Sequence, residues 1–405
     1  MSAHSAESAK ILIADDQPDV LEALRLLLRR EGYLVETVSS PSAVLEAITE
    51  RCFDTLLIDL NYARDTTSGR EGIELLSRVK ALDAALPTIV MTGWASIEVA
   101  VEAMRHGARE FVQKPWDNEQ LLALLRKQVA TCKLLRRRQQ AEVEKRREAL
   151  MAAEAQRQLL PQRVPLSDRL EFFAVCQPAR DVGGDYYDFI ELGAERTGFV
   201  VADVEGKGMP AALFASTVQA TLRSHARRHE AVRPSGLIAS VNEHFRTSAD
   251  ATSYSTLFYA EVDEQRRSLT YVNAGHNPPL LLRRRCASSM ASAQTPFATG
   301  VAPEVSVKRL EAGGPVIGFF ADCVYEEATI ELERGDLLVA YTDGITEAFN
   351  EEGAEFGETR LRELLLENSH LSVAALGERI LETLRLWCAT APQHDDLTFI
   401  IMKMK

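Results

Sequence analysis

From Lys10 to Pro115 the chain alternates short apolar runs with stretches of helical spacing, and this alternation restricts the fold more than any other feature. Five runs read as strands, and the stretches between them place apolar residues on one face of a helix. The predicted strands are Ile11–Ala14, Leu34–Val38, Thr55–Ile58, Thr88–Met91 and Glu110–Val112. Such alternation predicts an α/β doubly wound domain with a five-stranded parallel sheet, whose functional residues lie at the carboxyl ends of the strands.

Polar side chains stand at four of those strand ends. Asp15 and Asp16 follow the first strand, Asp59 the third, Thr92 the fourth and Lys114 the fifth. The acidic pair can hold Mg²⁺ while Asp59 accepts a phosphoryl group, and Lys114 can neutralise the charge of the product. Taken singly, the acidic pair could be a helix N-cap and Lys114 a surface charge. Their occurrence at successive strand ends favours a phosphoryl-accepting site.

This arrangement, together with Lys114-Pro115, resembles the receiver domain of two-component response regulators. The resemblance implies that Asp59 is the phosphoacceptor and that a sensor histidine kinase supplies the phosphoryl group. It also implies a Mg²⁺ site formed by Asp15, Asp16, Asp59 and the backbone carbonyl of Asn61.

The receiver resemblance further implies a switch built from three residues. Thr92 would be the switch hydroxyl and Phe111 the switch aromatic, with Lys114 beside the phosphorylated aspartate. The segment Asn61–Gly72 is longer than the usual short loop at this place. It could screen the phosphorylation site, contact a kinase, or be a tolerated surface insertion.

A long helical stretch follows the receiver pattern. Asp117–Gln120 has capping-box chemistry, and no strong breaker precedes Pro161. One helix from Asn118 to about Leu160 would span roughly 60 Å at 1.5 Å per residue. Its seam becomes polar beyond Leu135, so a parallel two-stranded coiled coil would be weakly specified, which suits a switch. We predict a homodimer through this helix, with a solvated spacer as the alternative.

The C-terminal half carries four acidic turns, each beside a strand-like run. They contain Asp185 in Gly-Gly-Asp, Asp203 in Asp-Val-Glu-Gly-Lys-Gly, Asp343 in Thr-Asp-Gly and Asp395 in His-Asp-Asp. Any one of them alone is more often a plain turn. Carboxylates gathered in one place repel each other unless cations lie between them. Two divalent ions with oxygen ligands can generate hydroxide for in-line attack on phosphorus.

The order of these turns resembles the bacterial serine phosphatases of the metal-dependent protein phosphatase (PPM) superfamily, of the SpoIIE/RsbU type. The blocks Ala155–Pro161, Asn273–Pro279 and Gly314–Gly318 are also similar to that family. The consecutive strand runs of this half independently favour antiparallel hairpins and an α+β fold. The resemblance implies an αββα sandwich with two or more Mn²⁺ or Mg²⁺ ions at one end.

The phosphatase resemblance also implies a role for each acidic turn. Asp203 would bridge two ions, the carbonyl oxygen of Val204 would contact one, and Asp343 with Asp395 would complete the second. Asp185 would hold metal-bound waters or a third ion. The implied reaction is direct hydrolysis of phosphoserine or phosphothreonine by water activated between two metals, without a covalent intermediate. The implied substrate is a phosphorylated regulatory protein of the anti-sigma-factor antagonist type.

Several residues near these turns carry their own expectations. Arg180 stands where some relatives place a phosphate-gripping arginine, although a surface salt bridge explains it equally well. Glu205 replaces a usually small residue and could alter metal affinity. We expect His276 to brace a turn rather than to donate a proton. Asp395 is preferred to Asp396 as the ligand because it aligns with the family's first acidic position.

Length and composition set the remaining bounds. A chain of 405 residues predicts two domains and a connector. We expect a flexible N-terminus at 1–9, a receiver domain at 10–126, a helical linker at 127–164 and a phosphatase domain at 165–405. The net charge of −13 argues against nucleic acid or a membrane surface as a partner. The absence of a signal pattern and the scattered cysteines predict a cytoplasmic protein.

Competing functions lack their motifs. The single Cys-x₅-Arg match, Cys132 to Arg138, lies inside the predicted long helix and not in an anion-binding loop. No phosphate-binding Gly-x₄-Gly-Lys-[Ser/Thr] motif is present, and no basic helix-turn-helix pattern appears. A diguanylate cyclase would leave three of the four acidic turns unexplained. The remaining alternative is a non-catalytic response-regulator adaptor whose phosphatase-like domain only binds a partner.

Overall fold

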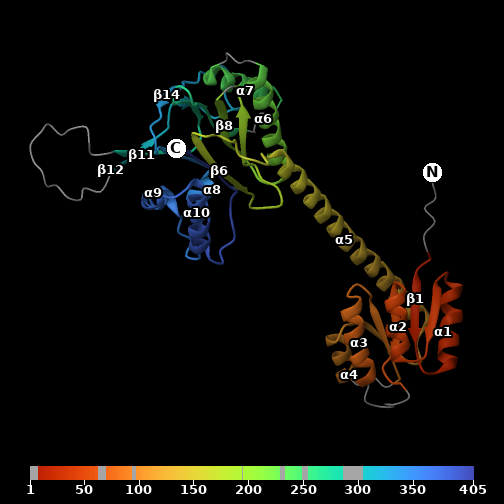
Figure 1. Cartoon of the computed structure of the whole chain (residues 1–405). Helices are drawn as coiled ribbons and strands as arrows, with labels where there is room; N and C mark the ends of the chain where they lie inside the picture. Colours follow the sequence, from red (N-terminus) through yellow and green to blue (C-terminus); the bar gives the residue numbers. More distant parts are fainter. Residues whose placement is uncertain are drawn as a thin grey trace, which may run out of the picture. The chain divides into compact units, whose positions relative to one another are not determined.

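The computed structural model describes residues 8–62, 70–93, 97–193, 195–228, 233–248, 254–285 and 304–405. The chain divides into two compact units, Met1–Arg146 and Arg147–Lys405 (Figure 1). Most of the long segment after Asp59, residues 63–69, lies outside the described residues, so its predicted role is not addressed by the structure.

The first unit contains a sheet of five parallel strands in the order β2-β1-β3-β4-β5. Its strands are β1 (Lys10–Ala14), β2 (Leu34–Val38), β3 (Thr55–Asp59), β4 (Thr88–Thr92) and β5 (Ala108–Gln113). Its first helices are α1 (Pro18–Arg30), α2 (Pro41–Glu50), α3 (Arg70–Leu82) and α4 (Ile97–Arg105). Every residue of β3 and β4 is buried, because helices cover both faces of the sheet. The predicted α/β doubly wound fold is confirmed.

A continuous helix, α5 (Asn118–Leu159), follows the sheet. The Asp117 carboxylate caps it by accepting a hydrogen bond from the Gln120 N–H at 2.9 Å. This agrees with the single long helix that the capping residues and the lack of breakers predicted.

The two halves of α5 have different surroundings. Its first turns complete the core of the first unit through the buried side chains of Leu121 and Leu125. Arg136 still contacts this unit, because its Nη2 donates to the Phe53 carbonyl oxygen at 2.8 Å. Residues 137–148 are all exposed. This stretch is therefore held as a helix by its own backbone and not by a core within the chain.

The second unit is a sandwich of two β-sheets (Figure 1). In the six-stranded sheet, β7 to β10 are antiparallel, β14 pairs antiparallel with β10, and β13 adds a short parallel pair to β10. Its strands are β7 (Tyr186–Glu191), β8 (Arg196–Val204), β9 (Ser255–Asp263), β10 (Ser268–Ala274), β13 (Gly313–Gly314) and β14 (Ala328–Glu331). The five-stranded sheet is antiparallel, in the order β12-β11-β15-β16-β6. Its strands are β6 (Leu170–Gln177), β11 (Leu280–Arg285), β12 (Glu304–Arg309), β15 (Leu337–Tyr341) and β16 (Leu397–Met404).

Helices cover the outer face of each sheet, which confirms the predicted αββα sandwich. α6 (Met209–Arg228) and α7 (Pro234–Ser248) pack on the six-stranded sheet, and α9 (Gly357–Asn368) and α10 (Val373–Cys388) lie on the other side (Figure 1). The core between the sheets is apolar, with Phe199, Phe258 and Met402 fully buried. A short helix, α8 (Asp343–Thr346), begins directly after β15.

Within the described part of the chain, no helix combines the length and the apolar character needed to span a bilayer.

Candidate functional site

The carboxyl ends of the parallel strands bring the predicted phosphorylation residues together. Lys114 Nζ lies 2.6 Å from Asp15 Oδ2 and 2.8 Å from Asp59 Oδ2, so it joins the ends of three strands. Ligand oxygens of Asp15, Asp16 and Asp59 all lie within 4.8 Å of one another. The Asn61 N–H donates to Asp59 Oδ1 at 3.4 Å, which holds the chain after β3 near the cluster.

Burial and hydrogen bonding act in opposite directions on the pKa values of Asp15 and Lys114 in this cluster. Burial raises the pKa of Asp15, while the hydrogen bond from Lys114 opposes that rise. Burial alone would lower the pKa of Lys114, but its hydrogen bonds to Asp15 and Asp59 outweigh burial and raise it. The three carboxylates offer oxygen ligands that suit Mg²⁺, with the lysine as the cation already present.

The two predicted switch residues differ in exposure. Thr92 is buried at the end of β4, with 3% of its surface exposed. Phe111, on β5, is 47% exposed. The structure thus buries Thr92 at the end of β4, the strand next to β3 with Asp59, and leaves the aromatic ring on the surface.

The four acidic turns of the second unit come from both sheets of the sandwich. Asp185 precedes β7 and Asp203 lies on β8, where Tyr186 pairs with Ala202. Asp343 begins α8 after β15, and Asp395 precedes β16. Because β15 and β16 are paired neighbours, Asp343 and Asp395 lie at the same end of their sheet.

Burial and mutual repulsion disfavour charge on these carboxylates. The pKa of Asp203 is raised to about 7, first by burial and then by Asp343 and Asp395. The pKa of Asp185 is raised well above its usual range by burial and by the Asp203 charge. Burial and Asp395 also raise the pKa of Asp343. A set of buried carboxylates that repel each other fits divalent cations, which would remove both penalties.

The spacing of this second set differs from that of the first unit. Within the described part of the chain, no three of Asp185, Asp203, Asp343 and Asp395 have oxygens that all lie within 4.8 Å of one another. The four carboxylates are therefore more widely spaced than those of the first unit.

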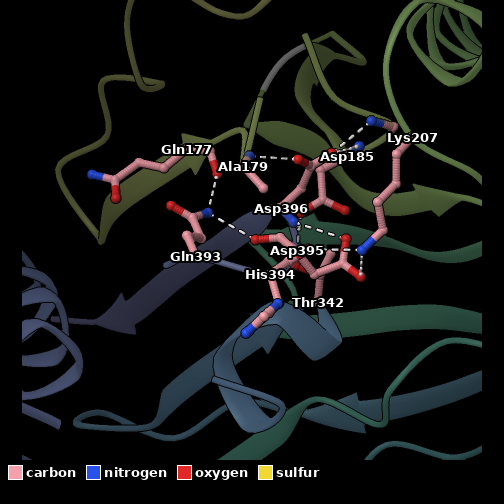
Figure 2. A network of polar contacts seen from close by, with 10 residues as sticks. Gln177, Ala179, Asp185, Lys207, Thr342, Gln393, His394, Asp395 and Asp396 are labelled. Carbon is pink, nitrogen blue, oxygen red and sulfur yellow. Dashed lines mark hydrogen bonds and ion pairs between the residues drawn. The ribbon is translucent and has the colours of Figure 1, made fainter. Parts of the chain in front are cut away.

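A neighbouring carboxylate, Asp396, shapes the first acidic turn. It accepts hydrogen bonds from the N–H groups of Ala179 and Gly184, each at 2.7 Å, and from Asp185 N–H at 3.4 Å (Figure 2). A Cβ on Gly183 would collide with this carboxylate. Asp396 thus holds the backbone of the turn that carries Asp185. The sequence had indicated only that Asp395, and not Asp396, would be the metal ligand.

The glycines of the first turn also allow close approach to Val204. A Cβ on Gly184 would lie 2.6 Å from the Val204 carbonyl oxygen. That oxygen, predicted to be a metal ligand, therefore faces the turn that carries Asp185. Asp185 itself is oriented by Thr342, whose hydroxyl donates to Asp185 Oδ2 at 2.8 Å.

Lys207 is bound to one of the predicted metal ligands. Its Nζ lies 2.8 Å from Asp395 Oδ2 and donates to the His394 carbonyl oxygen at 2.7 Å (Figure 2). The hydrogen bond to Asp395 raises the pKa of Lys207. Arg180 is exposed, and its charge is near enough to Lys207 to oppose that rise. Glu205 is exposed and accepts a hydrogen bond from the Tyr254 hydroxyl at 3.0 Å.

His276 braces a turn, as expected. Its N–H donates to Asn273 Oδ1 at 2.7 Å, and Asn273 Nδ2 donates back to the His276 carbonyl oxygen at 3.0 Å. The ring Nδ1 lies 2.8 Å from the Thr256 hydroxyl. Burial lowers the pKa of His276 to about 4, so the ring is neutral at physiological pH.

One contact to the site was not predicted at all. Gln156, near the end of α5, forms two hydrogen bonds with the backbone of Gly183. Gln219 on α6 donates to the Leu159 carbonyl oxygen at 2.6 Å. The similarity of Ala155–Pro161 to the phosphatase family was the one sequence signal that could have indicated this contact.

Comparisons with known proteins identify both halves of the chain. The family model described as Stage II sporulation protein E (SpoIIE) matches residues 193–405, and the response regulator receiver domain model matches residues 11–126. Phosphoserine phosphatase RsbU of Bacillus subtilis (strain 168) is 30% identical over 63% of this chain and 69% of its own. The transcriptional regulatory protein ZraR of Escherichia coli O157:H7 is 38% identical over 31% of this chain and 27% of its own. Among solved structures, the SiaA-PP2C domain of Pseudomonas aeruginosa aligns with a TM-score of 0.55 and 22% identity, covering 65% of this chain and 99% of that domain, which supports the fold.

Proposed function

The chain belongs to the SpoIIE family and carries a receiver domain, and on that premise we propose that it is a receiver-regulated protein phosphatase. The proposed reaction is hydrolysis of phosphoserine or phosphothreonine on a partner protein. The observation that carries this proposal is the gathering of four buried or half-buried aspartates from both sheets at one place. A fold that only bound a partner would have no use for carboxylates whose charged forms are disfavoured.

The chain's own residues divide the work at this site. Mn²⁺ or Mg²⁺ ions, when bound, supply a nucleophilic water and neutralise the phosphoryl charge. Asp185, Asp203, Asp343, Asp395 and the Val204 carbonyl oxygen are the groups that would hold them. Asp396 and Thr342 hold Asp185 and its turn, and we propose that the exposed Arg180 binds the substrate's phosphate.

The regulation proposed for the first unit follows from its acidic cluster. A sensor histidine kinase would supply the phosphoryl group to Asp59, with Mg²⁺ held by Asp15, Asp16, Asp59 and the Asn61 carbonyl oxygen. Thr92, Phe111 and Lys114 would report the modification. We propose domain limits of 10–126 for the receiver, 127–164 for the linker and 165–405 for the phosphatase.

The partners are proposed from the same premise. The substrate would be a phosphorylated regulatory protein of the anti-sigma-factor antagonist type, in the cytoplasm. We also propose that the chain pairs with a second copy through α5, whose stretch 137–148 is exposed and so accessible to a partner helix.

Phosphate release from a phosphoserine protein, with and without Mn²⁺, tests the proposal. Asp203→Asn should abolish turnover, since it removes a ligand charge but almost no volume, while circular dichroism stays unchanged. The matched control is Asp181→Asn, a nearby exposed aspartate that should keep full activity. Near-normal turnover in Asp203→Asn would contradict the two-metal assignment. No turnover by the wild-type chain with Mn²⁺, both with and without beryllofluoride on Asp59, would favour the non-catalytic adaptor.

A further inference from the structure

A cavity of about 250 Å³ lies against the acidic site of the second unit. It shares Asp395 and Gly344 with that site. Its other walls come from the last turns of α10, from the residues after α8 and from the loop before β16. The cavity is therefore directly adjacent to the proposed metal ligands, with Asp395 forming part of its wall.

The lining of the cavity is mixed. Leu381, Leu384 and Leu397 supply apolar walls, and Gln177, Gln393 and His394 supply polar ones. The side chains of Glu347 and Arg385, which also line it, are exposed at its mouth. The space is large enough to hold several water molecules. Releasing such waters from apolar walls favours an apolar ligand.

The walls are held by contacts that do not depend on a ligand. Trp387 Nε1 donates to the Ala348 carbonyl oxygen at 3.0 Å, which ties α10 to the residues after α8. Gln393 Nε2 donates to the carbonyl oxygens of Gln177 at 2.9 Å and Asp395 at 2.8 Å, and lies between them in Figure 2. The cavity is therefore preformed beside the acidic site.

We propose that this cavity is a substrate subsite that takes an aliphatic side chain lying within a few residues of the phosphoserine. The inference rests on the proposed phosphatase function and adds a substrate class to it. A phosphoryl group at the carboxylates must come within reach of Asp395, which forms both the site and the cavity wall. The peptide chain on that side of the phosphoserine then passes over the mouth, and one of its side chains can enter.

The test uses the full-length chain with Mn²⁺ and two kinds of probe. The first is a panel of alanine-based phosphoserine heptapeptides that carry a single leucine at each position in turn. The second is p-nitrophenyl phosphate, which has no flanking residues. Two variants fill the cavity, Cys388→Phe on α10 and Ala391→Phe in the following loop. The matched control is Leu386→Phe, which lies on α10, is 75% exposed and does not line the cavity.

We expect leucine at one position to raise kcat/KM by about tenfold or more over alanine, the discrimination typical of an apolar pocket. Both cavity-filling variants should lose that gain and keep their rate on p-nitrophenyl phosphate, whereas Leu386→Phe should keep both. Because Cys388→Phe and Ala391→Phe lie on different segments, one variant can still test the subsite if the other fails to fold. Equal rates for all peptides, or a leucine gain that survives in a folded filler variant, would overturn the subsite. A wild-type chain inactive on every probe would instead contradict the phosphatase function, and the subsite with it.

Discussion

Gln156 and Gly183 are joined by a pair of hydrogen bonds: Gln156 Nε2 donates to the Gly183 carbonyl oxygen at 2.7 Å, and the Gly183 N–H donates to Gln156 Oε1 at 3.1 Å. Gly183 lies two residues before Asp185, in the turn that Asp396 also holds. One side chain of α5 therefore satisfies both backbone groups of a residue in the first acidic turn. A displacement of the end of this helix would therefore shift the backbone of that turn through these two hydrogen bonds.

Gln156→Ala should weaken Mn²⁺ binding at the acidic site. The change removes two hydrogen bonds, each worth about 1 kcal/mol, so the turn would be less ordered and the affinity would fall by up to about thirtyfold. Mn²⁺ binding can be followed by calorimetry and compared with the metal dependence of phosphate release. The control is Gln158→Ala, whose side chain contacts only Glu154 of the same helix. Equal affinity in both variants would show that the pair is a passive contact.

Asp59 should be the residue that takes a phosphoryl group from a small phosphodonor in the presence of Mg²⁺. Its Oδ2 faces Lys114, which can neutralise the added charge. Asp59→Ala should eliminate the alkali-labile acyl phosphate, while Asp19→Ala, in the first turn of α1, should leave it unchanged. Persistence of the label in Asp59→Ala would place the acceptor elsewhere.

Lys207→Met should increase the affinity of the acidic site for Mn²⁺. Lys207 neutralises Asp395 at 2.8 Å, so a metal ion must replace this lysine as the partner of that carboxylate. The pair is partly exposed, and such pairs contribute about 0.2–1 kcal/mol, which corresponds to an increase of up to about fivefold. The neighbouring Arg180→Met is the control, because it removes a cation that has no bond to Asp395. A lower affinity in Lys207→Met would mean that the lysine mainly braces the loop.

His276 should make the fold less stable as the pH falls from about 6.5 to about 4. Its pKa is lowered to about 4 in the folded chain, so the unfolded chain takes up a proton first. The stability gained from the neutral ring is present above pH 6.5, and a loss on the order of 3 kcal/mol is expected by pH 4. Urea unfolding with EDTA should show a shallower pH dependence for His276→Gln than for wild type. The exposed His370→Gln should follow wild type, and parallel curves for all three would contradict this role.

The predicted strands of the first unit agree with the structure to within one or two residues, because most are short apolar runs and Leu34–Val38 alternates apolar and polar residues. For example, the strand predicted at Thr55–Ile58 corresponds to β3, which spans Thr55–Asp59. Helices were less completely predicted in the second unit. α7 was not singled out, although its buried Leu237, Val241 and Phe245 recur at the spacing of one helical face.

The acidic turns were predictable because four of them recur beside strand-like runs, although any one alone would be read as a plain turn. The residues that hold these turns in place, Asp396 and Gln156, could not be predicted from the sequence. Asp395 and Asp396 are adjacent and chemically identical, and only the fold shows that Asp396 is buried among backbone N–H groups. The contact between Gln156 and Gly183 involves a backbone group 27 residues away, which leaves no complementary side chain in the sequence to indicate it.

The exposed stretch of α5 offers a test of how the two units communicate. Residues 137–148 contact no core within the chain, so extra residues after Arg138 should lengthen the helix without disturbing either unit. Five added residues rotate the following helix by about 140°, whereas seven rotate it by only about 20° from its original phase. The seven-residue insertion is therefore the matched control for added length.

We expect phosphatase activity to change when beryllofluoride modifies Asp59 in the wild type and in the seven-residue variant. The five-residue variant should lose this response and keep its basal hydrolysis, because the phase of Gln156 relative to the first unit is altered while its contact with Gly183 is intact. Phosphate release measured with and without beryllofluoride, on variants of equal thermal stability, decides the matter. An unchanged response in the five-residue variant would mean that α5 is a passive tether and that the signal reaches the acidic site by another route.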